Sequence, residues 1–231
     1  MKEVVRLCGI NGIEIQQRLS SLQECGVEFD IEEDCLDAVV TMSSDILDAR
    51  SFDMIKSRVY NLFEEEVYSS VNEPLQVIAA KLLKINGRTL AVAESLTGGE
   101  ICSRLAEVPG ISENLYEGIV CYNRASKMQR LGVSRSVLDQ YGAVSRETAY
   151  LMVKGLNIEP VDIGLATTGL AGPTGDEGKP VGLVYIGVGG GDFIIVFERH
   201  FEGSRDQIRR AASNVALFYL IRYLKGDILR L

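Results

Sequence analysis

A serine, a tyrosine and a lysine in this sequence have the types and spacing needed for acyl transfer. Ser95 follows a run of small apolar residues, and Tyr122 and Lys127 lie five residues apart further along the chain. A serine becomes a nucleophile when a base takes its proton, and lysine is such a base when its pKa falls toward neutrality. Lys127, near a predicted helix start, partly buried and close to Arg124, meets conditions that favour the neutral amine. Tyr122 could hydrogen-bond to either partner.

Other polar groups could complete a site around this serine. The N–H groups of Gly98 and Gly99, or of the loop 168–171, are candidate oxyanion donors. Arg205 and Arg209 lie four residues apart near a predicted helix start and could clamp a phosphate. Each feature also has an ordinary explanation as a turn, a loop or a solvated surface charge. The residues alone therefore indicate an α/β domain with an anion or nucleotide pocket.

Hydrophobic patterning predicts the elements that hold these residues. Leu90 to Ala93 is a strand of small apolar residues, and residues 97–99 make a tight turn before a helix near Glu100. Residues 118–122 and 162–167 predict two further buried strands, each followed by polar residues. Ligands bind at the carboxyl ends of strands in open α/β sheets, so these segments should converge there. The glycine turn and the helix N-terminus would favour an anionic group.

The remaining pattern predicts a three-layer α/β/α domain with a mixed sheet, over residues 71–231. Gly189 to Gly191 separate two strands of an antiparallel hairpin. Ser145 and Ser204 should cap helices, and residues 132–142 are expected to connect elements. The other elements are expected at 125–131 and 146–156 (helices), 181–188 and 193–201 (hairpin strands), and from 205 onward (last helix).

Residues 1–70 predict a separate small α+β domain with the order β-α-β-β-α. Ser44 is expected to cap its second helix. The boundary lies at residues 71–74, where Asn72 would cap the next helix and Pro74 would occupy its first turn.

Composition excludes several functional classes. The chain has 24 basic and 32 acidic residues, so its net charge of −8 argues against nucleic-acid or anionic-membrane partners. Five cysteines without a CxxC motif, and one histidine, give no zinc-type spacing, so no metal or cofactor is expected. No apolar run reaches the roughly 20 residues that span a bilayer, and the start is too short and too charged for a signal peptide. A reduced, cytoplasmic setting is the expectation.

The ordered motifs of the larger domain resemble a known family. AESLTGG, CYNRASK, YGAVS, TTGLAGPTG, KPVG and FEGSRDQIRRAA, spread over about residues 72–225, closely resemble the C-terminal domain of the CinA (competence/damage-inducible) family. Residues 1–70 are similar to the middle region that precedes this domain in full-length members. The family's N-terminal domain, linked to ADP-ribose pyrophosphatase activity, has no counterpart here.

The resemblance implies a nicotinamide mononucleotide deamidase that acts in pyridine-nucleotide salvage and NAD metabolism. It implies that Ser95 is the nucleophile, Lys127 the base and Tyr122 the helper, and that the protein forms a homo-oligomer, often a dimer. The substrate would be held by Thr97, Gly98, Gly99, Thr168, Gly169, Ala171 and Gly172, with Arg205 or Arg209 on its phosphate by our inference from charge.

Two positions depart from the family pattern. Leu96 stands where the family usually has a cysteine. The family's tyrosine is usually followed by any residue and then an asparagine, whereas Tyr122 is followed by Asn123 and Arg124. The second departure favours an alternative hypothesis, in which the pocket binds a nucleotide as a regulatory module without catalysis. Ammonia release separates the two hypotheses.

Overall fold

The computed structural model describes residues 1–228, which form two β-sheets with separate helices. The first sheet belongs to a small α+β domain and has the strand order β2-β3-β1-β4 with antiparallel pairing. Its elements are β1 (Lys2–Cys8), α1 (Gly12–Leu19), the 3-10 helix η1 (Ser20–Cys25), β2 (Glu28–Asp34), β3 (Asp37–Ser43), α2 (Ala49–Leu62) and β4 (Val67–Ser69).

One face of the small sheet is covered by both of its helices. Ala38, Val40 and Met42 alternate along β3 as buried residues, as expected for a strand with one face in a core. They pack with Ile15 of α1 and Val59 of α2 in a common apolar cluster. The small domain therefore has a hydrophobic core of its own.

The second sheet is mixed and has the order β6-β5-β7-β8-β9. β5 pairs in parallel with β6 and β7, whereas β8 pairs antiparallel with β7 and β9. Its elements are α3 (Leu75–Asn86), β5 (Leu90–Glu94), α4 (Glu100–Ala106), η2 (Ile111–Glu113), β6 (Leu115–Val120), α5 (Arg124–Leu131), α6 (Arg135–Tyr141), α7 (Arg146–Leu156), β7 (Ile163–Gly169), β8 (Leu183–Gly190), β9 (Phe193–His200) and α8 (Arg205–Lys225).

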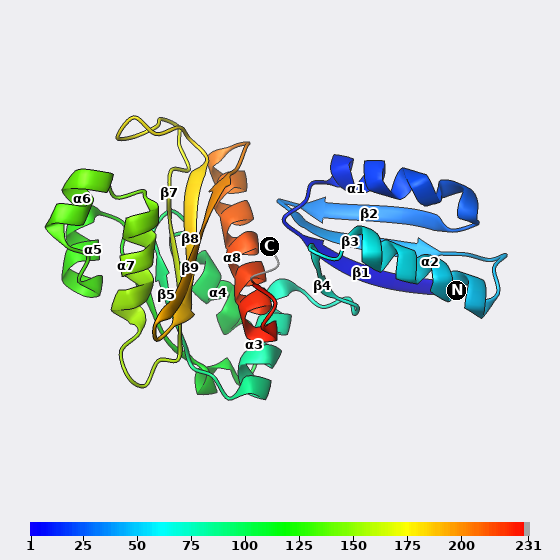
Figure 1. Ribbon diagram of the computed structural model, residues 1–231, viewed down its shortest axis with the longest axis horizontal. Coiled ribbons are helices and arrows are strands. Elements are labelled where there is room, and N and C mark those ends of the chain that lie inside the picture. The colour runs from blue at the N-terminus through cyan, green and yellow to red at the C-terminus, as the bar shows by residue number, and fades with distance from the viewer. Residues whose placement is uncertain (229–231) are drawn as a thin grey trace.

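Helices cover both faces of this sheet and produce the expected three-layer α/β/α arrangement. Figure 1 shows α5, α6 and α7 on one side and α3, α4 and α8 on the other, with the small domain beyond α8. The long helix α8 is buried along most of its length because it packs against the sheet, against α3 and against β1 and β4 of the small domain. None of the helices in residues 1–228 is long and apolar enough to cross a membrane.

Several local predictions are wrong in detail. Asp48, not Ser44, caps α2, and Pro74, not Asn72, is the N-cap of α3. The strand expected to be buried at 118–122 is β6, an edge strand whose residues are mostly exposed. Ser145 and Ser204 do cap α7 and α8, and Ser204 also forms a capping box with Gln207.

Two short elements escaped prediction. α6 lies within the expected connecting region 132–142, and β4 adds a fourth strand to the small sheet. A three-residue strand and a seven-residue helix are shorter than the windows over which periodicity is informative.

Candidate active site

The candidate site lies where β5 ends, between the ends of its two parallel neighbours. Glu94, the last residue of β5, pairs with Thr167 of β7 and with Val120 of β6. The Ser95 N–H donates to the Thr167 carbonyl at 3.0 Å, and the chain then turns into α4. The sheet therefore fixes the backbone of Ser95 from its central position, as the strand-end prediction requires.

Lys127 reaches Ser95 from the first turn of α5. Its Nζ lies 2.9 Å from the Ser95 hydroxyl and 2.9 Å from the Cys121 carbonyl oxygen. The lysine is only 1% exposed, and Ser95 is 6% exposed. The serine and lysine, 32 positions apart in the sequence, thus form a buried hydrogen-bonded pair.

Burial lowers the pKa of Lys127. Weaker interactions with Cys121 and Glu177 oppose that shift, and no carboxylate among residues 1–228 forms an ion pair with the lysine. Arg124 was expected to help lower the pKa of Lys127, but its charge is balanced by ion pairs with Asp139 at 2.5 Å and with Glu177 at 3.1 Å. Burial is therefore the cause of the lowered pKa. A buried amine without a counter-ion favours its neutral form, which can accept a proton.

Glu94 occupies the helix N-terminus that was expected to attract an anionic ligand. Its side chain is fully buried, and its two carboxylate oxygens accept hydrogen bonds from the N–H groups of Gly99, Ile101 and Cys102 at 2.9, 3.2 and 2.9 Å. The protein thus supplies its own anion to the positive end of α4. The prediction of an external anion at this helix terminus is wrong.

The same arrangement corrects the predicted oxyanion donors. The Gly99 N–H donates to Glu94, and the Gly98 N–H donates to the Ser95 carbonyl at 3.1 Å. Within residues 1–228, the N–H groups of Leu96 and Thr97 are left without an acceptor. Gly98 and Gly99 instead shape the turn, since both have positive φ (65° and 97°), which glycine adopts without steric cost.

Arg209 holds this turn from α8. Its Nε donates to the Leu96 carbonyl at 3.1 Å, and its Nη2 donates to the Thr97 carbonyl at 3.0 Å. These bonds commit the guanidinium to the backbone beside Ser95 rather than to an open phosphate position. Of the two arginines proposed for a phosphate, Arg205 is therefore the accessible one.

Tyr122 and Arg205 are joined by a hydrogen bond. Tyr122 is 55% exposed, and its hydroxyl lies 2.5 Å from Nη2 of Arg205. Arg205 Nη1 also donates to the Gly172 carbonyl at 2.5 Å. The expected hydrogen bond from Tyr122 to Ser95 or Lys127 is thus replaced by one to Arg205.

The predicted threonines line the site as buried, hydrogen-bonded groups. The hydroxyls of Thr97 and Thr167 lie 2.9 Å apart, and both residues are fully buried. The Thr168 hydroxyl donates to the Ala143 carbonyl at 2.7 Å. These bonds join the Ser95 turn, the end of β7 and the segment before α7 into one framework.

A sequence comparison places this framework in a known family. The sequence model described as the CinA C-terminal domain matches residues 72–224. The chain belongs to the CinA family. A CinA-like protein of Fusobacterium nucleatum subsp. nucleatum is 48% identical over 141 residues, which make up 61% of this chain and 34% of that protein. The chain thus spans about a third of that relative's length.

Solved structures of CinA proteins have the same fold as this CinA domain. A CinA superfamily protein from Klebsiella pneumoniae 700603 has a TM-score of 0.64 at 28% identity, covering 66% of this chain and 96% of that one. A competence/damage inducible protein from Agrobacterium tumefaciens has a TM-score of 0.60 at 34% identity, covering 68% of this chain and 99% of that one.

The two departures of this CinA domain from the family pattern have structural explanations. Leu96 is buried and packs in the main apolar core. Asn123 caps α5, because its side chain accepts from the Ser126 N–H at 2.9 Å. Arg124 pairs with Glu177 and so ties the loop 170–182 to α5.

Sequence reasoning missed the contacts of Glu94 and Glu177, and it assigned Arg124 to the pKa of Lys127 rather than to an ion pair with Glu177. Glu94 lies inside the AESLTGG motif, and this position directly before Ser95 was the available signal. Glu177 also accepts from the Ala143 N–H at 3.0 Å. Lys179, nearby, donates to the Tyr141 and Val144 carbonyls at 2.6 Å each. Charged side chains therefore anchor the loop after β7 of the CinA domain to α5 and to the segment before α7.

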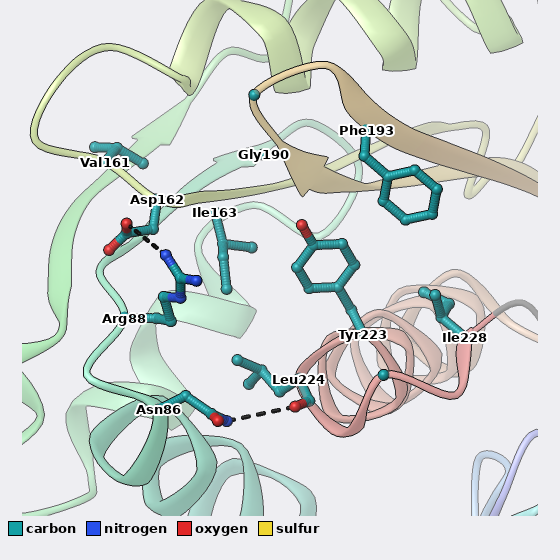
Figure 2. A pocket seen from close by; sticks show the side chains of 12 residues that line it. Asn86, Arg88, Val161, Asp162, Ile163, Gly190, Phe193, Tyr223, Leu224 and Ile228 are labelled. Atoms are coloured by element: carbon teal, nitrogen blue, oxygen red, sulfur yellow. Dashed lines mark hydrogen bonds and ion pairs between the residues drawn. The ribbon is translucent and has the colours of Figure 1, made fainter.

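The CinA domain also has a cavity that Ser95 does not line. It has a volume of about 710 Å³ and is located at the opposite ends of β5 and β7, next to the Arg88–Asp162 ion pair of 3.1 Å. Figure 2 shows Arg88 from the turn before β5, Phe193 from β9 and Tyr223 from α8 around it. Its position separates it from the serine–lysine pair.

Replacing Glu94 with glutamine is expected to lower the melting temperature by about 5–15 °C. The amide keeps one acceptor oxygen but loses the charge and turns a donor toward backbone N–H groups, which should cost about 2–4 kcal/mol. Because Ser95 is the next residue, any reaction that depends on this serine should slow by roughly 100-fold. Thermal unfolding measures the change in melting temperature, and initial reaction rates measure the loss of activity.

Glu100→Gln is the matched control, since Glu100 begins the same helix but, among residues 1–228, forms an ion pair only with the partly exposed Arg210, at 3.0 Å. It should change stability by less than about 1 kcal/mol. Equal melting temperatures for the two variants would contradict the role assigned to Glu94.

Proposed function

We propose that the domain hydrolyses the carboxamide of nicotinamide mononucleotide, giving nicotinic acid mononucleotide and ammonia. The observation that carries this proposal is the 2.9 Å contact between Lys127 Nζ and Ser95 Oγ, made by a lysine that is almost fully buried. Such a pair can activate a serine without a histidine or a metal ion. Membership of the CinA family supports the substrate class.

In the first half of the reaction, neutral Lys127 takes the proton of Ser95 while Oγ attacks the carboxamide carbon. The negative oxygen of the tetrahedral intermediate accepts hydrogen bonds from the free N–H groups of Leu96 and Thr97. The carbon–nitrogen bond then breaks, and the Lys127 ammonium gives its proton to the departing nitrogen. Ammonia leaves, and an ester joins the nicotinoyl group to Ser95.

In the second half, Lys127 takes a proton from water as the water oxygen attacks the ester carbon. The bond to Oγ breaks, the ammonium returns its proton to Ser95, and the carboxylic acid is released. One amide and one water are consumed, and one acid and one ammonia are formed. The same lysine serves as base and acid in both halves, as general acid–base catalysis requires.

Arg205 is the residue we assign to the substrate phosphate. It is exposed and contacts Tyr122 and the Gly172 carbonyl, and its guanidinium can form paired bonds to phosphate oxygens. Arg209 acts instead as a positioning residue for the Ser95 turn. Tyr122 orients Arg205 in this arrangement and helps the reaction through that contact.

The test is to incubate the purified chain with nicotinamide mononucleotide and quantify ammonia and the acid product, with and without a chelator. We expect both products in equal amounts and no effect of the chelator. Nicotinamide riboside, which lacks the phosphate, is the control substrate, and Arg205→Gln should raise KM for the nucleotide only. Absence of both products would refute the deamidase function.

A non-catalytic nucleotide-binding module is the second candidate. The observation that favours it is the position of Tyr122, which contacts Arg205 rather than Ser95. It predicts that nicotinamide mononucleotide raises the melting temperature while no ammonia forms.

A further inference from the structure

A buried asparagine on α8 connects the small domain to the helix that follows Ser95. Asn214 is 1% exposed. Its Oδ1 accepts a hydrogen bond from Nη1 of Arg104, on α4, at 2.8 Å. Its Nδ2 donates to the Asp34 and Cys35 carbonyls of the small domain at 3.0 and 2.9 Å. One side chain therefore contacts both α4 and the small domain.

The chemistry of Arg104 fixes the orientation of this asparagine. A guanidinium has only donors, so the amide of Asn214 must turn its oxygen toward Arg104 and its N–H groups toward the small domain. Arg104 is 5% exposed, and it also donates to Ser213 Oγ and Gln76 Oε1, at 3.1 Å each. Because these acceptors are neutral and the cation is buried, each of them matters for the placement of the guanidinium.

The part of the small domain that Asn214 holds is the turn between β2 and β3. Cys35 and Leu36 form this turn, and both have positive φ (50° and 69°), which such two-residue turns normally obtain from glycine, asparagine or aspartate. Other residues keep this conformation where the surrounding structure holds them in it. Here both side chains pack against the main apolar core, and Asn214 fixes the backbone. The CinA domain therefore holds the β2–β3 turn in place.

A second and more exposed link runs beside the first. Arg210 of α8 pairs with Glu100 of α4 at 3.0 Å and with Asp34 at 3.5 Å. Residues four positions apart share one face of a helix, so positions 210 and 214 of α8 join positions 100 and 104 of α4 to the same turn. The Arg210 side chain is 41% exposed, and water therefore weakens this link.

The same two helices also hold the Ser95 turn. The N–H groups of Ile101 and Cys102, on α4, donate to the Glu94 carboxylate at 3.2 and 2.9 Å. Arg209 of α8 donates to two carbonyls of the turn after Ser95. Because α4 has only seven residues and protein interiors transmit strain, a shift at one end of this helix reaches the other.

We propose that Asn214 and Arg210 are positioning residues for the nucleophile, through which the docked small domain sets the position of α4 and of the Ser95 turn. The proposal rests on the proposed function, in which Ser95 attacks the substrate. Loss of the contacts to the β2–β3 turn frees Asn214 and so loosens Arg104. The first turn of α4 then holds Glu94 less firmly, and the serine hydroxyl, on the next residue, is placed less accurately for attack. Small errors of placement at a reacting group slow a reaction strongly.

The test uses Asn214→Asp, which separates the two sides of the link. The carboxylate still accepts from Arg104 but cannot donate to the small-domain carbonyls. Amide hydrogen exchange on the full chain should become about tenfold faster at the Ile101 and Cys102 N–H groups, the reporter amides. For nicotinamide mononucleotide, kcat should fall by about tenfold and KM should stay within about twofold. Arg210→Gln changes a partly exposed side chain, so it should fold and give the same effects at about threefold.

Lys225→Met is the matched control. Lys225 also joins α8 to the small domain, because its Nζ donates to the Tyr68 carbonyl at 2.8 Å. It is the last residue of α8, and within residues 1–228 it forms no hydrogen bond or ion pair with α4. Its substitution should weaken the domain contact but leave the reporter amides and kcat within about twofold of the wild type.

Three outcomes would overturn the proposal. The first is unchanged exchange of the reporter amides in both Asn214→Asp and Arg210→Gln. The second is equal acceleration in Lys225→Met, which would reflect general destabilisation, and the third is faster exchange with an unaltered kcat. A wild type that forms no ammonia would refute the deamidase function, whereas the exchange measurement would still show whether the small domain holds α4.

Discussion

Replacing Lys127 with methionine is expected to lower kcat for carboxamide hydrolysis by about 10³–10⁴-fold. Methionine fills a similar volume but cannot accept the Ser95 proton, and a positioned base contributes about 10²–10⁴-fold in rate. The loss should appear in kcat and leave KM nearly unchanged, because Lys127 is buried against Ser95, away from the arginine that we propose for the substrate phosphate. Initial rates of ammonia release over a range of substrate concentrations measure this.

Lys154→Met is the matched control for that substitution. Lys154 lies on α7 with its side chain exposed, so its loss should change kcat by less than twofold. A Lys127→Met protein that retains a tenth of wild-type turnover would contradict the role of this lysine as base. A cooperative unfolding transition of the variant verifies that it is folded.

The lowered pKa of Lys127 also predicts a pH dependence of stability. The ordinary lysine pKa is 10.5, and burial lowers it in the folded protein. Between the folded and unfolded pKa values the unfolded chain binds more protons, so the free energy of unfolding rises with pH across that window. Below the folded pKa, the full cost of the buried ammonium is present.

Comparison with Lys127→Met isolates the part of the pH dependence of unfolding that comes from Lys127. The stability of the wild type relative to the variant should increase as pH rises from neutral toward 10, since only the wild type loses a buried charge. Denaturant unfolding at several pH values measures the difference. A difference that stays flat, or falls with rising pH, would mean that the lysine is not desolvated in the folded state.

The serine–lysine pair was predictable from sequence because it depends on local rules. The small apolar strand before Ser95, the glycine turn after it and the spacing of Lys127 each restrict the backbone in a known way. Parallel strands bring their carboxyl ends to one edge, so the encounter of the two side chains follows from topology. The family motifs gave the same pair by an independent route.

The partners of charged side chains were not predictable in this way. Glu94 was expected only to leave the strand that ends at Ala93, and only the start of α4 at residue 100 brings its carboxylate onto three N–H groups. Arg209 has the helical spacing of a phosphate ligand, yet the Ser95 turn lies close enough to take its donors. Which groups a charged side chain contacts depends on the distances between elements, and hydrophobic periodicity does not encode those distances.

The exposed strand β6 shows the same limit for packing. Its sequence is apolar enough to suggest a buried strand, but its place at the sheet edge leaves most of its residues exposed. Strand order is a property of the whole sheet, so a single segment cannot reveal it. Tyr122 follows this edge strand, and its exposure explains why it contacts Arg205 instead of the buried pair.

Replacing Ser95 with alanine is expected to abolish ammonia release, with a loss of about 10⁴-fold or more in kcat. The attacking oxygen is removed, so neither the ester nor the product can form by this route. Binding should survive, because the framework of Thr97, Thr167 and Arg209 is held by bonds that do not involve the serine hydroxyl. Calorimetry with nicotinamide mononucleotide should give a Kd within about threefold of the wild-type value.

The double variant Ser95→Ala/Lys127→Met makes this prediction specific to a paired mechanism. Groups that act as a unit show non-additive losses, so removing both should cost no more than removing Ser95 alone. If the two losses instead multiply, the serine and lysine act in separate steps and the proton transfer across their 2.9 Å contact is not the catalytic event. If all three variants bind the nucleotide as the wild type does and the wild type also releases no ammonia, the binding-module hypothesis replaces the deamidase.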